Sequence, residues 1–96
     1  MEIKHRLIGT KGLFYIEEAG ENLAEMTYSK AGDTRIIIDH TEVLSDKLKG
    51  KGAGKQLVMA AVEHARKNNL KIIPLCPFAA SVFEKTPEIQ DVLDER

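Results

Sequence analysis

Residues 48–55 form the segment of this sequence best suited to hold an anion. The segment reads Leu-Lys-Gly-Lys-Gly-Ala-Gly-Lys, so three glycines alternate with small or basic residues. Glycine lets backbone N–H groups come close to an anion, and the unpaired N–H groups of a helix start add donors and partial positive charge. These features predict a cradle for a phosphorylated ligand. The residues expected to contact it are Lys49, Gly50, Lys51, Gly52, Ala53, Gly54 and Lys55.

The same lysines could instead form a solvated basic stretch, but the interleaved glycines favour the cradle. The segment is not a P-loop. That motif ends in Gly-Lys followed by Ser or Thr, whereas here Gly54-Lys55 is followed by Gln56.

Cys76 is the only cysteine and comes at the end of a predicted strand. Open α/β sheets place ligands at the carboxyl ends of their strands. A thiol in that position can act as a nucleophile or as an acid that protonates a leaving thiolate. The alternative is a buried structural cysteine, since free cysteines often pack as small hydrophobic residues.

His40 and Glu42 lie two residues apart on a predicted strand, so both should point to one face. Ile36 and Ile38 share that face if no bulge intervenes. Either His40 or Glu42 could accept a proton as a general base. The alternative is a surface ion pair at a sheet edge. The other two histidines are interpreted as structural or surface residues, and no Cys/His pair has metal-ligand spacing, so no metal site is predicted.

Composition restricts the classes of function. The 96 residues predict a single domain spanning 1–96, and 14 basic against 15 acidic residues give a net charge of −1. This charge argues against generic nucleic-acid binding, which needs a basic surface. One cysteine cannot form an internal disulfide, which favours a reducing compartment. The sequence offers no membrane-spanning stretch and no signal peptide at its start, so a cytoplasmic location is expected.

The pattern of apolar residues predicts strands in the first half of the chain and mainly helices after the glycine loop. β-Branched and aromatic runs separated by short turns predict four antiparallel strands, and apolar residues at helical spacing then predict a helix. A strand, a short helix and a final turn or helix follow. The expected strands are 2–8, 13–18, 23–30, 34–43 and 70–76, and the expected helices are 57–67, 78–85 and, with a turn as the alternative, 87–93.

The order of these elements predicts an α/β (α+β) fold. A mixed, mostly antiparallel sheet of about five strands carries one helix after the glycine loop and a short C-terminal helix. Gly54 projects onto the apolar stripe of the first helix, where it would let that helix pack close to the sheet. Core positions are expected for Phe14, Tyr15, Tyr28 and Phe83, and the charged end 91–96 is expected to be solvated.

Three segments resemble the GNAT acetyltransferase superfamily, and within it a subgroup of small GNAT-like proteins. They are Lys49-Gly50-Lys51-Gly52-Ala53-Gly54, Asp39-His40-Thr41-Glu42-Val43 and Ile73-Pro74-Leu75-Cys76-Pro77-Phe78. The loop follows the family's pyrophosphate-binding pattern, with lysine in place of glutamine or arginine at its start. The resemblance covers most of the chain and is strongest from residue 36 to 93.

The resemblance implies a minimal GNAT fold that binds acetyl-CoA as a co-substrate. The fourth and fifth strands would splay apart, with the pantetheine arm along Thr41, Glu42 and Val43 and the pyrophosphate on the glycine loop. The family's usual tyrosine acid has no match here, and Cys76 takes its place near the thioester.

The activity implied is acetyl transfer to a primary amine, with His40 or Glu42 as base. The alternative is a module that binds CoA or acyl-CoA without turnover. Either would be a monomer or a weak homodimer.

Overall fold

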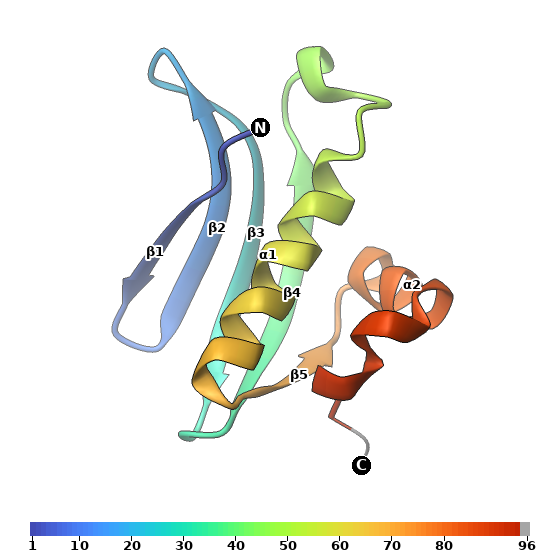
Figure 1. Ribbon diagram of the computed structural model, residues 1–96. Helices are drawn as coiled ribbons and strands as arrows, with labels where there is room; N and C mark the ends of the chain where they lie inside the picture. The colour runs from blue at the N-terminus through green and yellow to red at the C-terminus, as the bar shows by residue number, and fades with distance from the viewer. Residues whose placement is uncertain (95–96) are drawn as a thin grey trace.

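Five strands form one sheet whose spatial order follows the sequence in the computed structural model, which describes residues 1–94 (Figure 1). The first four strands pair antiparallel, and the fifth pairs parallel to the fourth. The predicted mixed sheet is therefore confirmed. The strands are β1 Lys4–Ile8, β2 Lys11–Glu18, β3 Glu21–Ala31, β4 Arg35–Val43 and β5 Lys71–Pro74.

Two α-helices and two short 3₁₀ helices complete the described chain: η1 Asp46–Leu48, α1 Ala53–Asn68, α2 Pro77–Lys85 and η2 Pro87–Val92. Helix α1 connects β4 to β5, as a parallel pair of neighbouring strands requires. It begins four residues earlier than its apolar pattern predicts, so the end of the glycine loop is its first turn. It ends at Asn69, whose φ of 56° is the left-handed conformation typical of a helix C-terminus.

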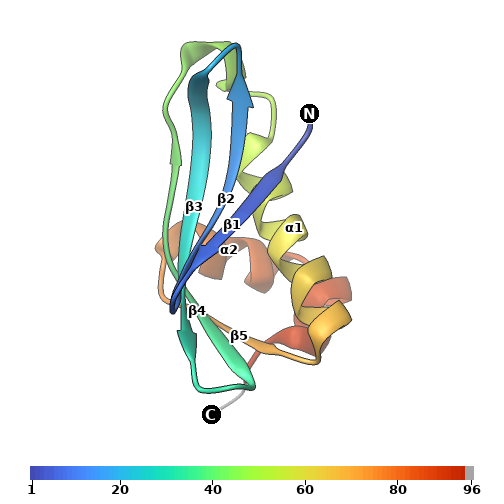
Figure 2. The same cartoon turned by 90° about the vertical axis from the view of Figure 1, so that its left-hand side faces the viewer.

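The core lies between α1 and one face of the sheet. A single cluster of buried apolar side chains joins β2, β3 and β4 to both α-helices and η2. Phe14, Tyr28 and Phe83 belong to it, as predicted. Tyr15 does not, because it alternates with the inward-pointing Phe14 and Ile16 and so points to the opposite face. Figure 2 shows α1 on one side of strands β1 to β4, so the opposite face of these strands is the one that α1 leaves uncovered.

A bulge interrupts β4 at Asp39. Ile38 pairs with Tyr28 and His40 pairs with the preceding residue of β3, Thr27, so Asp39 has no partner. An extra residue reverses the alternation of side chains beyond it. The expectation that His40 and Glu42 share a face with Ile36 and Ile38 required a strand without a bulge, and the bulge at Asp39 removes that condition. The two isoleucines are buried, whereas both polar residues are exposed.

Strand β5 is shorter than predicted and leaves β4 at Pro74. Pairing runs from Arg35 opposite Lys71 to Ile38 opposite Pro74 and stops there. The N–H groups of Leu75 and Cys76 then both donate to the carbonyl of Ile38, at 3.1 Å each. Beyond this point the chain turns into α2, so the end of β4 is not covered by a fifth strand. This is the splay that the family resemblance implies.

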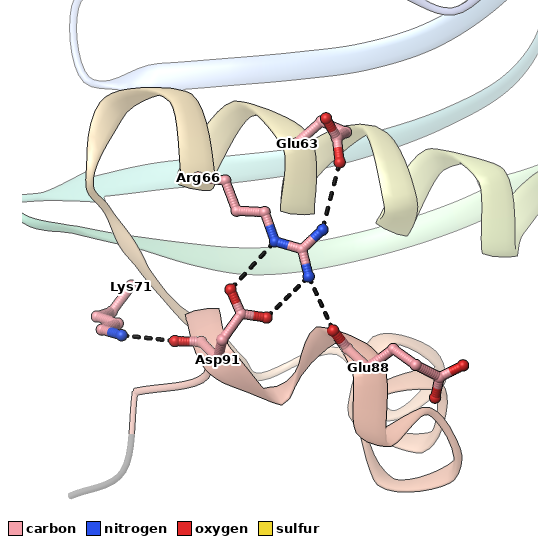
Figure 3. A network of polar contacts seen from close by, with 5 residues as sticks. All are labelled: Glu63, Arg66, Lys71, Glu88 and Asp91. Atoms are coloured by element: carbon pink, nitrogen blue, oxygen red, sulfur yellow. Dashed lines mark hydrogen bonds and ion pairs between the residues drawn. The ribbon is translucent and has the colours of Figure 1, made fainter.

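The C-terminal part of the described chain is attached to α1 rather than solvated throughout. Arg66 of α1 donates two hydrogen bonds to the carboxylate of Asp91, at 2.8 and 3.1 Å, and one to the carbonyl oxygen of Glu88 (Figure 3). The prediction of a solvated end holds for Asp91, which is exposed although Arg66 contacts it, and is wrong for Val92, whose apolar side chain is 3% exposed and belongs to the core. Residues 95–96 lie outside the described residues.

Candidate active site

The glycine loop presents unpaired N–H groups at the start of α1. Gly52 is the N-cap residue, with a φ of 73° and no side-chain cap, and its carbonyl accepts the first helical hydrogen bond from Gln56 N–H at 3.0 Å. The three N–H groups between them, at residues 53–55, have no acceptor within the helix. A residue with a β-carbon adopts the conformation of Gly52 only with strain. A helix start of this kind can bind an anion, and the predicted contact with a phosphorylated ligand stays a prediction.

A pocket of about 480 Å³ opens next to this helix start. Its walls come from the end of β4, η1, the glycine loop, the first turn of α1 and the start of α2. Apolar atoms dominate its surface. The lining residues are Thr41, Val43, Leu48, Lys49, Gly50, Gly52, Ala53, Gly54, Lys55 and Phe78.

Of the ten residues expected along the cofactor, eight line this pocket. The exceptions are Lys51 and Glu42, which are exposed and lie outside the lining. Leu48 and Phe78 were missed as site residues. In sequence, Leu48 is part of the glycine-rich segment and Phe78 is the first residue of the predicted helix 78–85. The apolar character of both is the one signal that could have placed them in a pocket wall.

Cys76 lies beside the pocket as the N-cap residue of α2. Its side chain is 5% exposed, and its Sγ is 3.5 Å from the Oγ1 of Thr41. Burial of the thiol opposes its ionisation. Hydrogen bonds from the Thr41 hydroxyl and from the backbone N–H groups of Ala79, Phe78 and Thr41 outweigh that effect and lower the pKa of Cys76 below its ordinary value. A helix start is one of the environments that lower the pKa of a cysteine.

His40 and Glu42 lie on the other face of the sheet from the pocket. His40 Nε2 is 3.2 Å from a carboxylate oxygen of Glu42, and the two side chains are 59% and 51% exposed. Neither lines the pocket. The structure therefore brings Thr41, Val43 and Cys76 together with the glycine loop and separates His40 and Glu42 from them.

The lysines around the loop differ in their partners. Lys49 forms an ion pair with Asp46 at 3.0 Å, and Lys47 forms one with Glu21 at 3.7 Å. Among residues 1–94, no ion pair engages Lys55, which lines the pocket in the first turn of α1. Its ammonium group is therefore available to an anion at the helix start.

Within residues 1–94, His, Cys, Asp and Glu side chains form no group of three or more that could hold a metal ion. None of the helices in that range is long and apolar enough to cross a membrane.

Residues 13–92 match the family model of the GCN5-related N-acetyltransferases. No curated protein matches the chain. Among solved structures, a GCN5-like protein from Staphylococcus aureus is 48% identical, with a TM-score of 0.74. The match covers 99% of this chain and 89% of that one.

Two more distant structures show the same fold. A ribosomal-protein-alanine N-acetyltransferase from Brucella melitensis is 14% identical with a TM-score of 0.67, and the match covers 93% of this chain and 65% of that one. A predicted acetyltransferase from Clostridium acetobutylicum, determined with acetyl-CoA, is 16% identical with a TM-score of 0.61, and the match covers 79% of this chain and 56% of that one. At these identities the likeness concerns the fold alone, and the chain spans less than two thirds of either protein.

Proposed function

Because the chain belongs to the GCN5-related N-acetyltransferase family, we propose that it transfers the acetyl group of acetyl-CoA to a primary amine. One observation carries the proposal. An apolar pocket lies between the open end of β4 and a helix start with unpaired N–H groups, with Cys76 next to it. CoA has the matching parts, which are an anionic pyrophosphate, a long pantetheine arm and a reactive thioester.

In this proposal the pyrophosphate lies at Gly50, Gly52 and the first turn of α1, where N–H donors and Lys55 balance its charge. The pantetheine arm follows Thr41 and Val43 along the uncovered end of β4. Lys51 does not line the pocket, and its charge adds to the positive potential around the loop. The acetyl group lies at the splay, near Cys76.

Acetyl transfer requires attack on the thioester carbonyl, breakage of its C–S bond and departure of CoA as a thiolate that gains a proton. Cys76 can supply that proton to CoA. Alternatively, the Cys76 thiolate attacks the thioester carbonyl and CoA leaves as a thiolate. The amine then attacks acetyl-Cys76 and releases the Cys76 thiolate, and the proton that the amine loses balances the one that CoA gains. The lowered pKa of Cys76 supports both routes, because it makes the thiol a better proton donor and also raises its thiolate fraction.

The amine acceptor would approach from the sheet face that α1 leaves uncovered. His40 and Glu42 point to that face at the end of β4, and either can take the proton that the amine loses. His40 and Glu42 lie outside the pocket, which supports an arrangement in which the cofactor and the acceptor occupy different sides of the splay.

The experiment that tests cofactor binding is a titration with acetyl-CoA followed by amide NMR. In the wild type, resonances of residues 41–55 and of Cys76 should shift. Gly52→Glu puts a carboxylate into the cradle and should abolish those shifts. Gly32→Glu is the matched control, because Gly32 has nearly the same positive φ, 70° against 73°, and lies in a turn outside the pocket. Absence of shifts in the wild type would overturn the proposal.

Turnover separates an enzyme from a module that only binds CoA. CoA released from acetyl-CoA in the presence of polyamines or lysine peptides can be followed by thiol detection. Cys76→Ala should abolish release and leave binding intact. Transient labelling of Cys76 by one acetyl group, seen by intact mass, would establish the covalent route. Binding without release in any acceptor series would favour the module.

A further inference from the structure

The hydroxyl of Thr41 is the side-chain group that meets the sulfur of Cys76. The two atoms are 3.5 Å apart, although the residues are 35 positions apart in the chain, at the end of β4 and at the start of α2. At this distance a thiol can donate to a hydroxyl oxygen, and the same hydroxyl can turn to donate to a thiolate. Thr41 can therefore partner Cys76 in both protonation states.

The bulge at Asp39 is what brings Thr41 to Cys76. In an unbroken strand, Thr41 would point to the face opposite Ile38, because side chains alternate. With the extra residue, Thr41 points to the same side as Ile38, which is the side of the pocket and of Cys76.

Polar contacts on the uncovered face hold the bulge residue. Asp39 accepts a hydrogen bond from the hydroxyl of Ser29 at 2.8 Å, and the ammonium group of Lys11 donates to that hydroxyl at 2.7 Å. These contacts tie the bulge of β4 to β3 and, through Ser29, to β2, so they support the register that places Thr41.

We propose that Thr41 is a positioning residue for Cys76, whose hydroxyl holds the sulfur at the splay and stabilises its reactive form. This inference rests on the proposed function for its purpose, since a reactive Cys76 matters only if it faces a thioester. It assigns to the Thr41 side chain a role separate from the backbone contact expected with the pantetheine arm.

The size of the expected effect follows from the other donors. The N–H groups of Phe78, Ala79 and Thr41 itself also favour the thiolate, so loss of the hydroxyl removes one contribution among several. One hydrogen bond to a charged group corresponds to a shift of about one pH unit in ionisation, or about tenfold less thiolate at a given pH below the midpoint.

Alkylation of Cys76 by iodoacetamide across a pH range tests the inference directly. The chain has one cysteine, so intact mass reports that residue alone. Thr41→Val keeps the shape and removes the hydroxyl, and its alkylation midpoint should rise by about one unit. Thr41→Ser keeps a hydroxyl and should match the wild type. Thr27→Val makes the same exchange on β3, outside the pocket, and should also match the wild type.

Two outcomes would overturn the inference. One is an unchanged profile in Thr41→Val, and the other is a Thr41→Ser profile that follows Thr41→Val. If Thr41→Val fails to fold, Thr41→Ala replaces it under the same criteria.

The readout does not depend on acetyl-CoA, so the inference and the proposed function can fail separately. A raised midpoint in a protein that never binds acetyl-CoA would leave the role of Thr41 standing and remove the proposed function. If the wild type turns over, Thr41→Val should lower kcat and leave KM nearly unchanged, because the hydroxyl acts on Cys76 rather than on binding. Turnover with an unaltered kcat would remove the role of Thr41 alone.

Discussion

The ring of Phe78 occupies the place that a β-carbon on residue 54 would need. A β-carbon built on Gly54 would lie 2.8 Å from two ring atoms of Phe78, closer than real β-carbons come to their neighbours. The group that approaches Gly54 closely is therefore a side chain of α2, and not the sheet as the apolar stripe of α1 predicts. Both residues line the pocket, so the contact links the first turn of α1 to the start of α2 at the candidate cofactor site.

Gly54→Ala should impair the pocket more than it impairs stability. Phe78 is 44% exposed, so its ring can move aside, and alanine improves helix propensity by about 0.5–1 kcal/mol over glycine. We expect a change of less than about 1 kcal/mol in the free energy of unfolding and a clear loss of acetyl-CoA affinity. Urea unfolding and calorimetric titration measure the two quantities.

The Phe78→Ala background provides the control for that prediction. Without the ring, alanine at residue 54 meets no obstacle from α2, so Gly54→Ala should cost much less affinity there than in the wild type. Equal losses in both backgrounds would show that the β-carbon itself, and not the displaced ring, obstructs the ligand.

Gly12→Ala should lower the free energy of unfolding more than it affects the pocket. A β-carbon on Gly12 would lie 2.0 Å from the Tyr28 ring, which is 1% exposed and whose hydroxyl is 2.7 Å from His5 Nε2. That ring cannot move without disturbing the core, so we expect a loss of about 2 kcal/mol or more in the free energy of unfolding, as for overpacked cores. Denaturant midpoints measure it. A midpoint equal to that of the wild type would mean that the core yields more readily than its packing indicates.

The positive charge of Lys55 should contribute to ligand binding in a salt-dependent way. Lys55→Ala should weaken acetyl-CoA binding by about threefold at low ionic strength, since it removes one exposed charge contact. The loss should shrink as added salt screens the charge. Lys67→Ala removes an equal charge from the last turn of the same helix, away from the pocket, and should leave the dissociation constant unchanged. A loss of equal size for both variants would indicate general attraction rather than a local contact.

Local patterns predicted the fold and the position of the glycine-rich helix start well, because both depend on short segments. The strands and helices differ from the expected ranges mainly at their ends, and α1 begins earlier because Gly52, Ala53 and Gly54 continue into its first turn. Helix boundaries depend on capping, and here the cap is a glycine in the left-handed conformation without a side-chain hydrogen bond.

The face of the sheet on which a residue lies could not be predicted where a bulge intervenes. Strict alternation of side chains along β4 would place His40 and Glu42 on the same face of the sheet as Ile36. Asp39, which has no partner in β3, shifts them to the opposite face. A bulge is defined by how β4 pairs with β3, and the sequence of one strand alone carries no information on that pairing. The same reversal brings Thr41 to Cys76, so the relation between these residues was also hidden in the sequence.

The histidines at the edge of α1 should make folding stability fall on acidification. His5 stacks on Phe14 with ring centroids 4.2 Å apart, and its ring lies 4.8 Å from that of His64. Burial lowers the pKa of both, and a positive neighbour lowers each further, His64 for His5 and Lys30 for His64. Their neutral forms thus favour the folded state.

The sign of the effect follows from these lowered pKa values. As the pH falls through about 6.5, the unfolded chain takes up protons before the folded one does, so stability present above that pH is lost below it. Urea midpoints at about pH 7.5 and about pH 5 should show the loss. The double variant His5→Gln, His64→Gln should reduce it, whereas His40→Gln on the exposed face should retain it. Retention of the full loss in the double variant would assign it to other groups.

The contact between Arg66 and Asp91 should hold η2 on α1 without affecting the cofactor site (Figure 3). Asp91→Ala should speed amide exchange across residues 87–94 and lower the thermal midpoint modestly, because both groups are exposed. Acetyl-CoA affinity should stay the same, since Asp91 and Arg66 lie outside the pocket that Thr41 and Lys55 line.

Two further variants separate geometry from charge in this contact. Arg66→Lys keeps the charge and loses the planar group that donates to both Asp91 oxygens and to the Glu88 carbonyl, so it should resemble Asp91→Ala. Glu63→Gln weakens only the longer contact, 3.4 Å, within α1 and should leave exchange in η2 unchanged. If Arg66→Lys instead exchanges like the wild type, charge alone holds η2 and the paired hydrogen bonds add nothing to it.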